Sequence, residues 1–142
     1  MIDVRESTDK LKILIVDDSE LNRELLAGML GDEYEIYQVE NGKKAIDILE
    51  ENREQFKLVL LDINMPVMNG YEATKAIRRS SHELAKKIPI IAMTANAFSE
   101  DIQHSLAAGM NAHVSKPVEM KVLEKTIRSI KSGGGGYRTA GY

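Results

Sequence analysis

Four short apolar segments of this sequence each run into polar residues that could bind a metal ion or a phosphate group. These polar residues are Asp17, Asp18, Asp62, Thr94 and Lys116. In an open parallel sheet the carboxyl ends of the strands lie along one edge, and ligands bind there. We therefore expect residues far apart in the sequence to share one pocket that holds carboxylates, a hydroxyl and an amine.

This set of side chains suits a divalent cation beside a phosphorylated carboxylate. Ionised carboxylates a few ångströms apart repel one another and attract a cation, and Mg²⁺ prefers such oxygen ligands. Asp62 is the best candidate nucleophile, because a carboxylate that attacks phosphorus forms an acyl phosphate. The cation, the Lys116 ammonium and the Thr94 hydroxyl would neutralise the phosphoryl oxygens. Taken singly, each residue has an ordinary explanation in a cap, a strand or a solvated surface, so the prediction depends on their joint placement.

The elements that must position these residues alternate along the chain. Apolar runs of strand length are followed by stretches of helical period, which predicts βαβ units. We expect strands at 11–16, 34–39, 58–61, 88–93 and 112–115, and helices at 19–30, 41–52, 70–79, 99–108 and 120–131. The first, third and fourth strands are the most apolar and should lie centrally. The order 2-1-3-4-5 satisfies this and keeps the crossovers right-handed. The predicted fold is α/β, a flavodoxin-like doubly wound (βα)5 with a five-stranded parallel sheet.

Helical period also assigns the apolar side chains that should face the core. The inward positions expected are Leu21, Leu25, Leu26, Met29 and Leu30 in the first helix, Ile102 and Leu106 in the fourth, and Leu123, Ile127 and Ile130 in the last. Ser19 is expected to cap the first helix. The polar stretch 80–87 is expected to be a connection without structure of its own.

The composition indicates one soluble domain. The chain has 142 residues, 43% hydrophobic and 29% charged, with a net charge of −3 and no cysteine. These values give no electrostatic case for nucleic-acid binding and exclude disulfides and thiolate sites. The apolar runs are far shorter than the roughly 20 residues of a membrane span. We expect a cytoplasmic domain that contacts neither nucleic acid nor membrane by itself.

The chain divides into three parts. Residues 1–10 are expected to form an N-terminal extension and residues 11–131 the folded domain. Residues 132–142 begin with Ser and four Gly, which is typical of a flexible linker. The last six residues are not expected to form an element by themselves, and the tail could be a tether, a natural end or an artificial addition.

Four segments resemble, in order and spacing, the receiver domain of two-component response regulators. They are LKILIVDDSELNR, LVLLDINMPVMNGYEAT, IPIIAMTANAF and AHVSKP. The resemblance covers about residues 11–131 and implies the doubly wound fold inferred above. It implies that Asp62 accepts phosphate from a phosphohistidine on a partner, with Mg²⁺ (or Mn²⁺) required. Such phosphotransfer is self-catalysed, so the domain would not be a classified enzyme by itself, and kinase activity would belong to other domains.

The resemblance also implies roles around the phosphoacceptor. Asp18 and Asp62 would ligate the metal directly, together with the backbone carbonyl of Asn64. Asp17 would act mainly through water.

On the phosphoryl side, the resemblance implies contacts from Thr94 and Lys116. The Lys116–Pro117 peptide would be cis, otherwise a minority state for X–Pro bonds. Asn64 and Asn96 would border the attacking water and influence how long the phosphoryl group lasts.

His113 departs from the family pattern. Three residues before Lys116, the family often carries a tyrosine or phenylalanine that swings inward with the threonine on phosphorylation. We favour a partly exposed histidine on an edge strand. The alternative hypothesis is that His113 still follows Thr94 and titrates near neutral pH.

Phosphorylation is expected to shift the population of conformers and repack one face of the domain. This face consists of the fourth helix, the fifth strand and the last helix, and it is also the expected surface for a homodimer. Its candidate surface residues are His104, Met110, Glu119 and Val122. The partner would be a histidine kinase or a histidine phosphotransfer domain, which family members usually dock on the first helix. Here that helix bears Leu21, Asn22 and Leu25.

The segments MTANAFSEDI and MNAHVSKPVE most resemble receivers of hybrid histidine kinases, so we predict such a context, with tethering if the kinase is membrane-bound. A free-standing single-domain response regulator is the alternative.

Other classes of function make different demands on these residues. An aspartyl-phosphate-forming Mg²⁺ phosphatase would need a second aspartate at the position of Asn64. A flavodoxin-like mononucleotide binder would need a phosphate-cradling loop, whereas Asp17 and Asp18 repel phosphate without a cation. A phosphate-independent scaffold is disfavoured, because every active-site position is filled.

Overall fold

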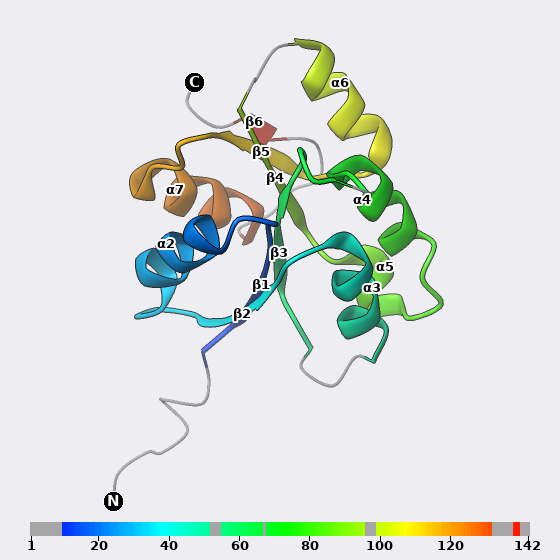
Figure 1. Cartoon of the computed structure of the whole chain (residues 1–142), viewed down its shortest axis with the longest axis horizontal. Helices are drawn as coiled ribbons and strands as arrows, with labels where there is room; N and C mark the ends of the chain where they lie inside the picture. Colours follow the sequence, from blue (N-terminus) through cyan, green and yellow to red (C-terminus); the bar gives the residue numbers. More distant parts are fainter. Residues whose placement is uncertain (1–9, 52–54, 67, 96–98, 132–137, 140–142) are drawn as a thin grey trace, which may run out of the picture.

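The computed structural model of the chain describes residues 10–51, 55–66, 68–95, 99–131 and 138–139. A parallel sheet runs through the middle of the domain, and helices cover both of its faces (Figure 1). Its strands are β1 (Lys12–Val16), β2 (Glu35–Val39), β3 (Leu58–Asp62), β4 (Ile90–Thr94) and β5 (Ala112–Ser115), joined by a short β6 (Arg138–Thr139). The order is β2-β1-β3-β4-β5-β6. The predicted order of the first five strands is therefore confirmed.

Strand β6 was not expected from the sequence. It pairs in parallel with β5, Ala112 opposite Arg138 and His113 opposite Thr139. We expected the last six residues to form no element by themselves, and Arg138 and Thr139 form this strand where they pair with β5. A strand of two residues is too short to show a periodicity in the sequence, so it could not be predicted from the pattern.

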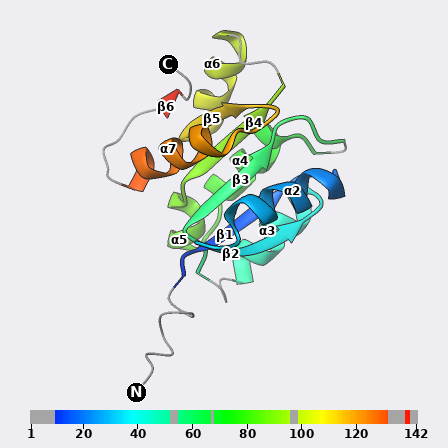
Figure 2. The same cartoon turned by 90° about the vertical axis from the view of Figure 1, so that its left-hand side faces the viewer.

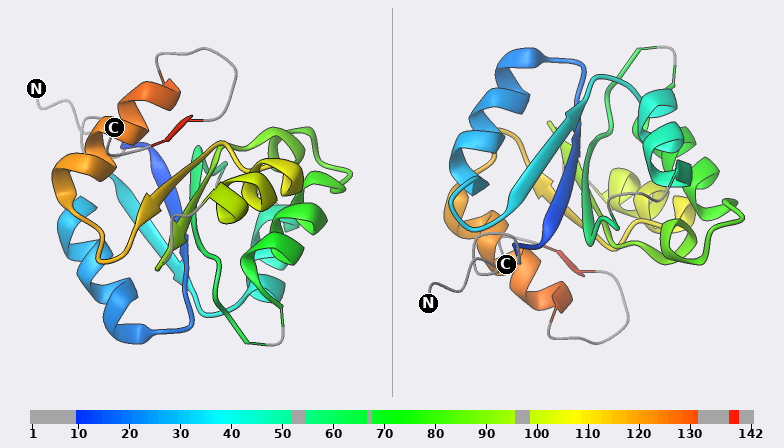
Figure 3. Two further views of the ribbon diagram at one scale, coloured as in Figure 1. Left: turned by 90° about the horizontal axis from the view of Figure 1, so that it is seen from above. Right: turned by 90° about the horizontal axis from the view of Figure 1, so that it is seen from below.

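Six helices complete the described part of the chain, labelled as in Figure 1. They are α2 (Glu20–Leu30), α3 (Gly42–Glu51), α4 (Gly70–Arg78), α5 (Glu83–Lys87), α6 (Ser99–Ala108) and α7 (Met120–Lys131). Helices α2 and α7 lie on one face of the sheet (Figure 2), and α3, α4 and α6 lie on the other (Figure 3). Helix α5 corrects the expectation of an unstructured connection at 80–87, and its Ala85 is buried in the core.

The core has two halves because successive side chains of a strand point to opposite faces of the sheet. Ile13 and Ile15 of β1 pack with α2 and α7, whereas Leu14 and Val16 pack with α3 and α4. All five residues of β3 are buried, as the continuous apolar run predicts for a central strand. The sheet is thus packed on both faces, and its carboxyl edge carries the candidate site.

Two helices orient their apolar residues differently from the prediction. Leu26 and Leu30 of α2 are buried, but Leu21 and Leu25 are 68% and 57% exposed. Leu106 of α6 is 55% exposed, and the buried positions there include Ser105 and Ala108. In each of these two helices, fewer apolar side chains pack against the sheet than the helical period of the sequence predicts. The expectation that Leu21, Leu25 and Leu106 face the core is therefore wrong.

Candidate functional site

Three acidic side chains meet at the carboxyl ends of β1 and β3. Asp17, Asp18 and Asp62 each offer a carboxylate oxygen, and these atoms lie within 4.8 Å of one another. Asp17 and Asp62 are each 1% exposed, whereas Asp18 is open to solvent. The structure thus brings together the three carboxylates that the sequence places at two separate strand ends.

Lys116 reaches this cluster from the far end of β5. Its Nζ donates to Asp62 Oδ1 at 2.8 Å and lies 3.8 Å from Asp17 Oδ2. The following Lys116–Pro117 peptide is cis. One ammonium therefore faces two buried carboxylates, and it partly compensates their charge.

Backbone N–H groups hold the two buried carboxylates. The Ser19 N–H donates to Asp17 Oδ1 at 2.9 Å, and the Asn64 N–H donates to Asp62 Oδ1 at 3.1 Å. Asp17 Oδ2 is buried and accepts no hydrogen bond from the described residues. A buried carboxylate oxygen facing two further carboxylates is a natural ligand for a hard cation. The donor set therefore fits Mg²⁺.

The electrostatics of Asp17 reflect the same crowding. Burial raises the pKa of its carboxyl group above the ordinary value, and the charges of Asp62 and Asp18 raise it further. The hydrogen bond from Ser19 and the charge of Lys116 act in the opposite direction. Without a cation, the ionised form of Asp17 is therefore disfavoured.

The loop between β3 and α4 folds back closely onto the strand that carries Asp62. The Gly70 N–H donates to Ile63 O at 2.9 Å. A Cβ atom on Gly70 would lie 2.7 Å from Asp62 O and from Ile63 Cα, closer than real contacts allow. Asn69 caps α4, and its capping box with Glu72 fixes where the helix begins. Glycine at position 70 is therefore required for the backbone path beside Asp62.

Thr94 and His113 lie on the face of the sheet away from α7. Their strand neighbours Met93 and Val114 belong to the core half beneath α2 and α7, so Thr94 and His113 point to the opposite side. Thr94 pairs with Ser115 in register and is 3% exposed. His113 is 2% exposed. The interpretation of His113 as a partly exposed edge residue is therefore wrong, because β6 pairs with β5 on its outer side.

The other predicted residues divide into placed and unplaced ones. His104, Glu119 and Val122 are at least partly accessible, but Met110 is buried and is not a surface residue. Asn64 is exposed beside the acidic cluster. Asn96 lies outside the described residues.

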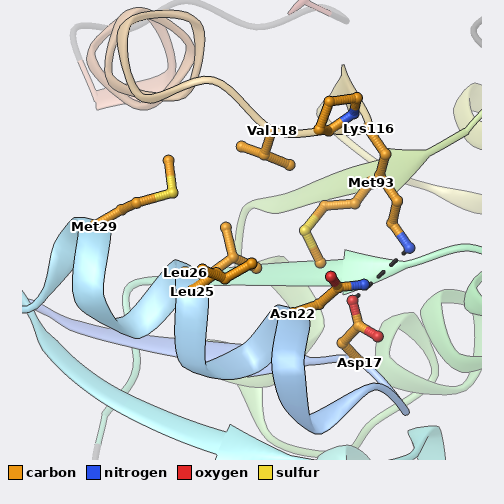
Figure 4. Close-up of a pocket in the computed structure, with 9 residues that line it drawn as sticks. Asp17, Asn22, Leu25, Leu26, Met29, Met93, Lys116 and Val118 are labelled. Carbon is orange, nitrogen blue, oxygen red and sulfur yellow. Dashed lines mark ion pairs between the residues drawn. The ribbon is translucent and has the colours of Figure 1, made fainter.

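An apolar cavity of about 260 Å³ opens beside the acidic cluster, between α2 and the loop that follows β5 (Figure 4). Its lining residues are Asp17, Asn22, Leu25, Leu26, Met29, Met93, Lys116, Pro117 and Val118. In Figure 4 the side chains of Asp17 and Lys116 point toward each other at one end of this cavity. Local sequence patterns do not predict this cavity, because it depends on how α2 and a distant loop face each other.

Comparison with known proteins agrees with this geometry. Residues 13–128 match the response regulator receiver domain family. The chain belongs to this family. It is a phosphoacceptor domain of the two-component signalling type. None of the helices in the described part of this receiver domain is long and apolar enough to cross a membrane.

Curated relatives of this receiver domain are much longer proteins. It is 40% identical over 123 residues to the sensor histidine kinase RcsC of Salmonella typhimurium, covering 86% of this chain and 12% of that protein. It is 40% identical over 125 residues to hybrid signal transduction histidine kinase G of Dictyostelium discoideum, covering 85% of this chain and 4% of that protein. The chain therefore spans a small part of the length of these relatives.

Solved structures of receiver domains superpose well on this chain. One is the receiver domain of sensor histidine kinase PA1611 from Pseudomonas aeruginosa, with a magnesium ion coordinated in its active-site cleft. Its TM-score is 0.77 at 33% identity, covering 87% of this chain and 99% of that one. Another is the receiver domain of Ssk1 in complex with the histidine phosphotransfer protein Ypd1 of Saccharomyces cerevisiae. Its TM-score is 0.73 at 30% identity, covering 83% of this chain and 86% of that one.

Proposed function

We propose that Asp62 accepts a phosphoryl group from a phosphohistidine of a partner protein, and that this domain passes the signal on within a hybrid histidine kinase. The observation that carries the proposal is the environment of Asp62. Its buried carboxylate receives an ammonium at 2.8 Å and a backbone N–H at 3.1 Å on the same oxygen. Two donors on Oδ1 fix the orientation of the carboxylate for attack on phosphorus.

In the proposed transfer, a carboxylate oxygen of Asp62 forms a bond to phosphorus. The bond between phosphorus and the histidine nitrogen breaks, and its electron pair returns to the imidazole. The product is an acyl phosphate on Asp62. Lys116 then provides a positive charge for a phosphoryl oxygen, and the Thr94 hydroxyl, at the end of the next strand, provides a hydrogen-bond donor.

We propose Mg²⁺, or Mn²⁺ with the same oxygen ligands, as the cofactor of this site. Asp18, Asp62 and the backbone carbonyl of Asn64 would hold the ion, with Asp17 acting through water. A bound divalent cation neutralises negative charge on the transferring phosphoryl group. The buried Asp17 Oδ2 without a hydrogen bond from the described residues supports this assignment, as does the magnesium ion in the PA1611 receiver domain.

The surface around the cavity supports a protein as the phosphodonor. Leu21 and Leu25 of α2 are exposed, and Leu25 lines the cavity that also has Lys116 in its wall. Large apolar side chains exposed together are typical of protein interaction sites. The complex of the Ssk1 receiver with Ypd1 gives the class of partner that we propose, a histidine phosphotransfer protein or a histidine kinase.

We propose that Thr94 and His113 form the conformational switch. They lie on the same face of two adjacent strands, where Thr94 pairs with Ser115 and His113 with Ala92, and both are buried, which supports a coupled movement. The side of the domain formed by α6, β5 and α7 would carry the conformational change to partners. A homodimer through this face, and the lack of contact with nucleic acid and membrane, stay predictions.

A free-standing regulator is the second candidate context. The chain covers 98% of the chemotaxis protein CheY4 of Vibrio cholerae in its crystal structure, with a TM-score of 0.78 at 33% identity. The hybrid-kinase context is favoured by the higher identity to RcsC and to hybrid kinase G. In either context the proposed chemistry at Asp62 is the same.

The function is tested by incubation with acetyl phosphate, with and without Mg²⁺, followed by intact-mass measurement. We expect the wild-type chain to gain one phosphoryl group only when Mg²⁺ is present, and Asp62→Asn to gain none. Asp47→Asn, at an exposed position on α3, is the matched control and should be labelled like the wild type. Labelling that survives Asp62→Asn, or that needs no Mg²⁺, would contradict the proposal.

A further inference from the structure

Arg23 joins the acidic turn to the neighbouring strand. From the first part of α2, its Nη1 donates to the backbone carbonyl of Asp17 at 2.7 Å. Its Nε donates to the side-chain oxygen of Gln38 in β2 at 3.3 Å. Both bonds have a charged donor, and the first is the shorter and therefore the stronger of the two. Arg23 thus links α2, β2 and the end of β1 at the point where the carboxylates gather.

The carbonyl that Arg23 binds belongs to the peptide group between Asp17 and Asp18. Asp17 is also held through its N–H, which donates to Val39 O at 3.3 Å, and through its Oδ1, which accepts from the Ser19 N–H at 2.9 Å. Asp18 is exposed, and its backbone sets only the point from which its side chain starts. The orientation of this one peptide therefore influences where the Asp18 carboxylate starts relative to that of Asp17.

We propose that Arg23 is a positioning residue for the metal site. By fixing the Asp17–Asp18 peptide, it holds the carboxylates of both residues in the geometry that a small octahedral cation requires. This inference rests on the proposed function, because it assigns Arg23 a role in binding Mg²⁺. It is not a contact to the ion, since a guanidinium has no electron pair to donate.

Two effects of Arg23 on cation binding have opposite signs, and this makes the proposal decidable. As a positive charge near an acidic cluster, Arg23 weakens the binding of Mg²⁺. As a support for the acidic turn, it strengthens that binding. A partly exposed charge in salt changes binding by only a few fold, whereas outer-shell partners of metal ligands are worth about tenfold or more. Positioning should therefore dominate, and removal of Arg23 should weaken binding.

The test is calorimetric titration of Mg²⁺ into the wild-type chain, Arg23→Met, Arg23→Lys and Arg128→Met. Arg128→Met removes the same charge from an exposed position of α7 near Tyr34, at the opposite end of the sheet. We expect Arg23→Met to bind Mg²⁺ about tenfold more weakly and Arg128→Met to bind like the wild type. Arg23→Lys, which keeps the charge and can still reach one carbonyl, should recover part of the loss. Unchanged or tighter binding by Arg23→Met would overturn the proposal.

A second measurement separates positioning from loss of fold. In the metal-free protein, amide resonances of Asp18 and Ser19 should shift in Arg23→Met, while those of the strand cores stay in place. If Arg23→Met does not fold, Arg23→Lys decides the matter, because this variant keeps the positive charge but lacks the guanidinium. If Arg23→Lys binds Mg²⁺ with the full affinity of the wild type, positioning by the guanidinium is refuted. A wild-type chain that does not bind Mg²⁺ would overturn the proposed function, whereas normal binding by wild type and Arg23→Met alike would overturn only the role of Arg23.

Discussion

At the scale of the residue, Asp17 is a carboxylate that is hard to ionise without a cation. Its pKa in the folded protein lies above the ordinary value of 3.8, chiefly because of burial. At pH values between 3.8 and the higher pKa of the folded protein, the folded state binds more protons than the unfolded state. The free energy of unfolding therefore falls as pH rises through this window. Without divalent cations, the ionised Asp17 costs stability at neutral pH.

We predict that Asp17→Asn stabilises the metal-free protein at pH 7 by about 1 kcal/mol, the size of a typical single-site effect. The amide keeps an acceptor for the Ser19 N–H and removes the charge. The advantage should shrink as pH is lowered toward 3.8, where Asp17 in the wild type becomes protonated. Urea unfolding in chelator at several pH values measures this. A loss of stability at pH 7 would show instead that attraction to Lys116 outweighs burial.

At the scale of the element, Arg78 joins the end of α4 to the segments around α5 and α6. Its guanidinium donates to Ile88 O at 2.7 Å, to Gly109 O at 2.9 Å and to Asn111 Oδ1 at 2.9 Å. Burial lowers the pKa of Arg78, although arginine remains charged in proteins. Arg78→Met should cost about 3 kcal/mol, because it removes these three partly buried hydrogen bonds at once, although Asn111 Oδ1 still accepts from the Ile90 N–H. Denaturant unfolding measures the loss, and Arg79→Met, at the next and exposed position, should change stability by less than about 0.5 kcal/mol. Equal effects of the two substitutions would contradict this role of Arg78.

The same scale shows what sequence patterns could and could not predict. The strands and their order were predictable, because continuous apolar runs such as that of β3 require burial on both faces. The polar residues at the strand ends were predictable as neighbours, because the carboxyl ends of parallel strands lie along one edge of the sheet. Helix α5 and strand β6 were not, since elements this short show no period and form only where other parts of the chain support them. The exposure of Leu25 and the roles of Arg23 and Arg78 depend on tertiary contacts between distant segments, which local patterns do not contain.

At the scale of the whole molecule, the candidate site and the surface that we propose for the phosphodonor lie at one end of the domain. Asp62 and Lys116 lie at the carboxyl edge of the sheet, and the cavity and Leu25 lie directly beside them. The exposed leucine of α5, Leu84, lines a separate pocket with Pro89 just before the start of β4, at the amino end of the sheet. A protein phosphodonor must cover the first end to reach Asp62, whereas a small donor need not touch Leu25.

This arrangement allows phosphoryl transfer from a protein donor to be tested separately from phosphoryl transfer from a small molecule. We predict that Leu25→Ser slows phosphorylation of Asp62 by a histidine phosphotransfer protein on the order of tenfold, the effect of losing one central interface residue. The donor should be one shown beforehand to transfer to the wild-type chain. Acetyl phosphate should label Leu25→Ser at the wild-type rate, because the carboxylates and Lys116 are untouched. Leu84→Ser, which removes an exposed leucine of similar accessibility (48% against 57%), should slow neither reaction. Equal slowing with both donors would mean that Leu25 supports the site itself rather than the contact with the partner.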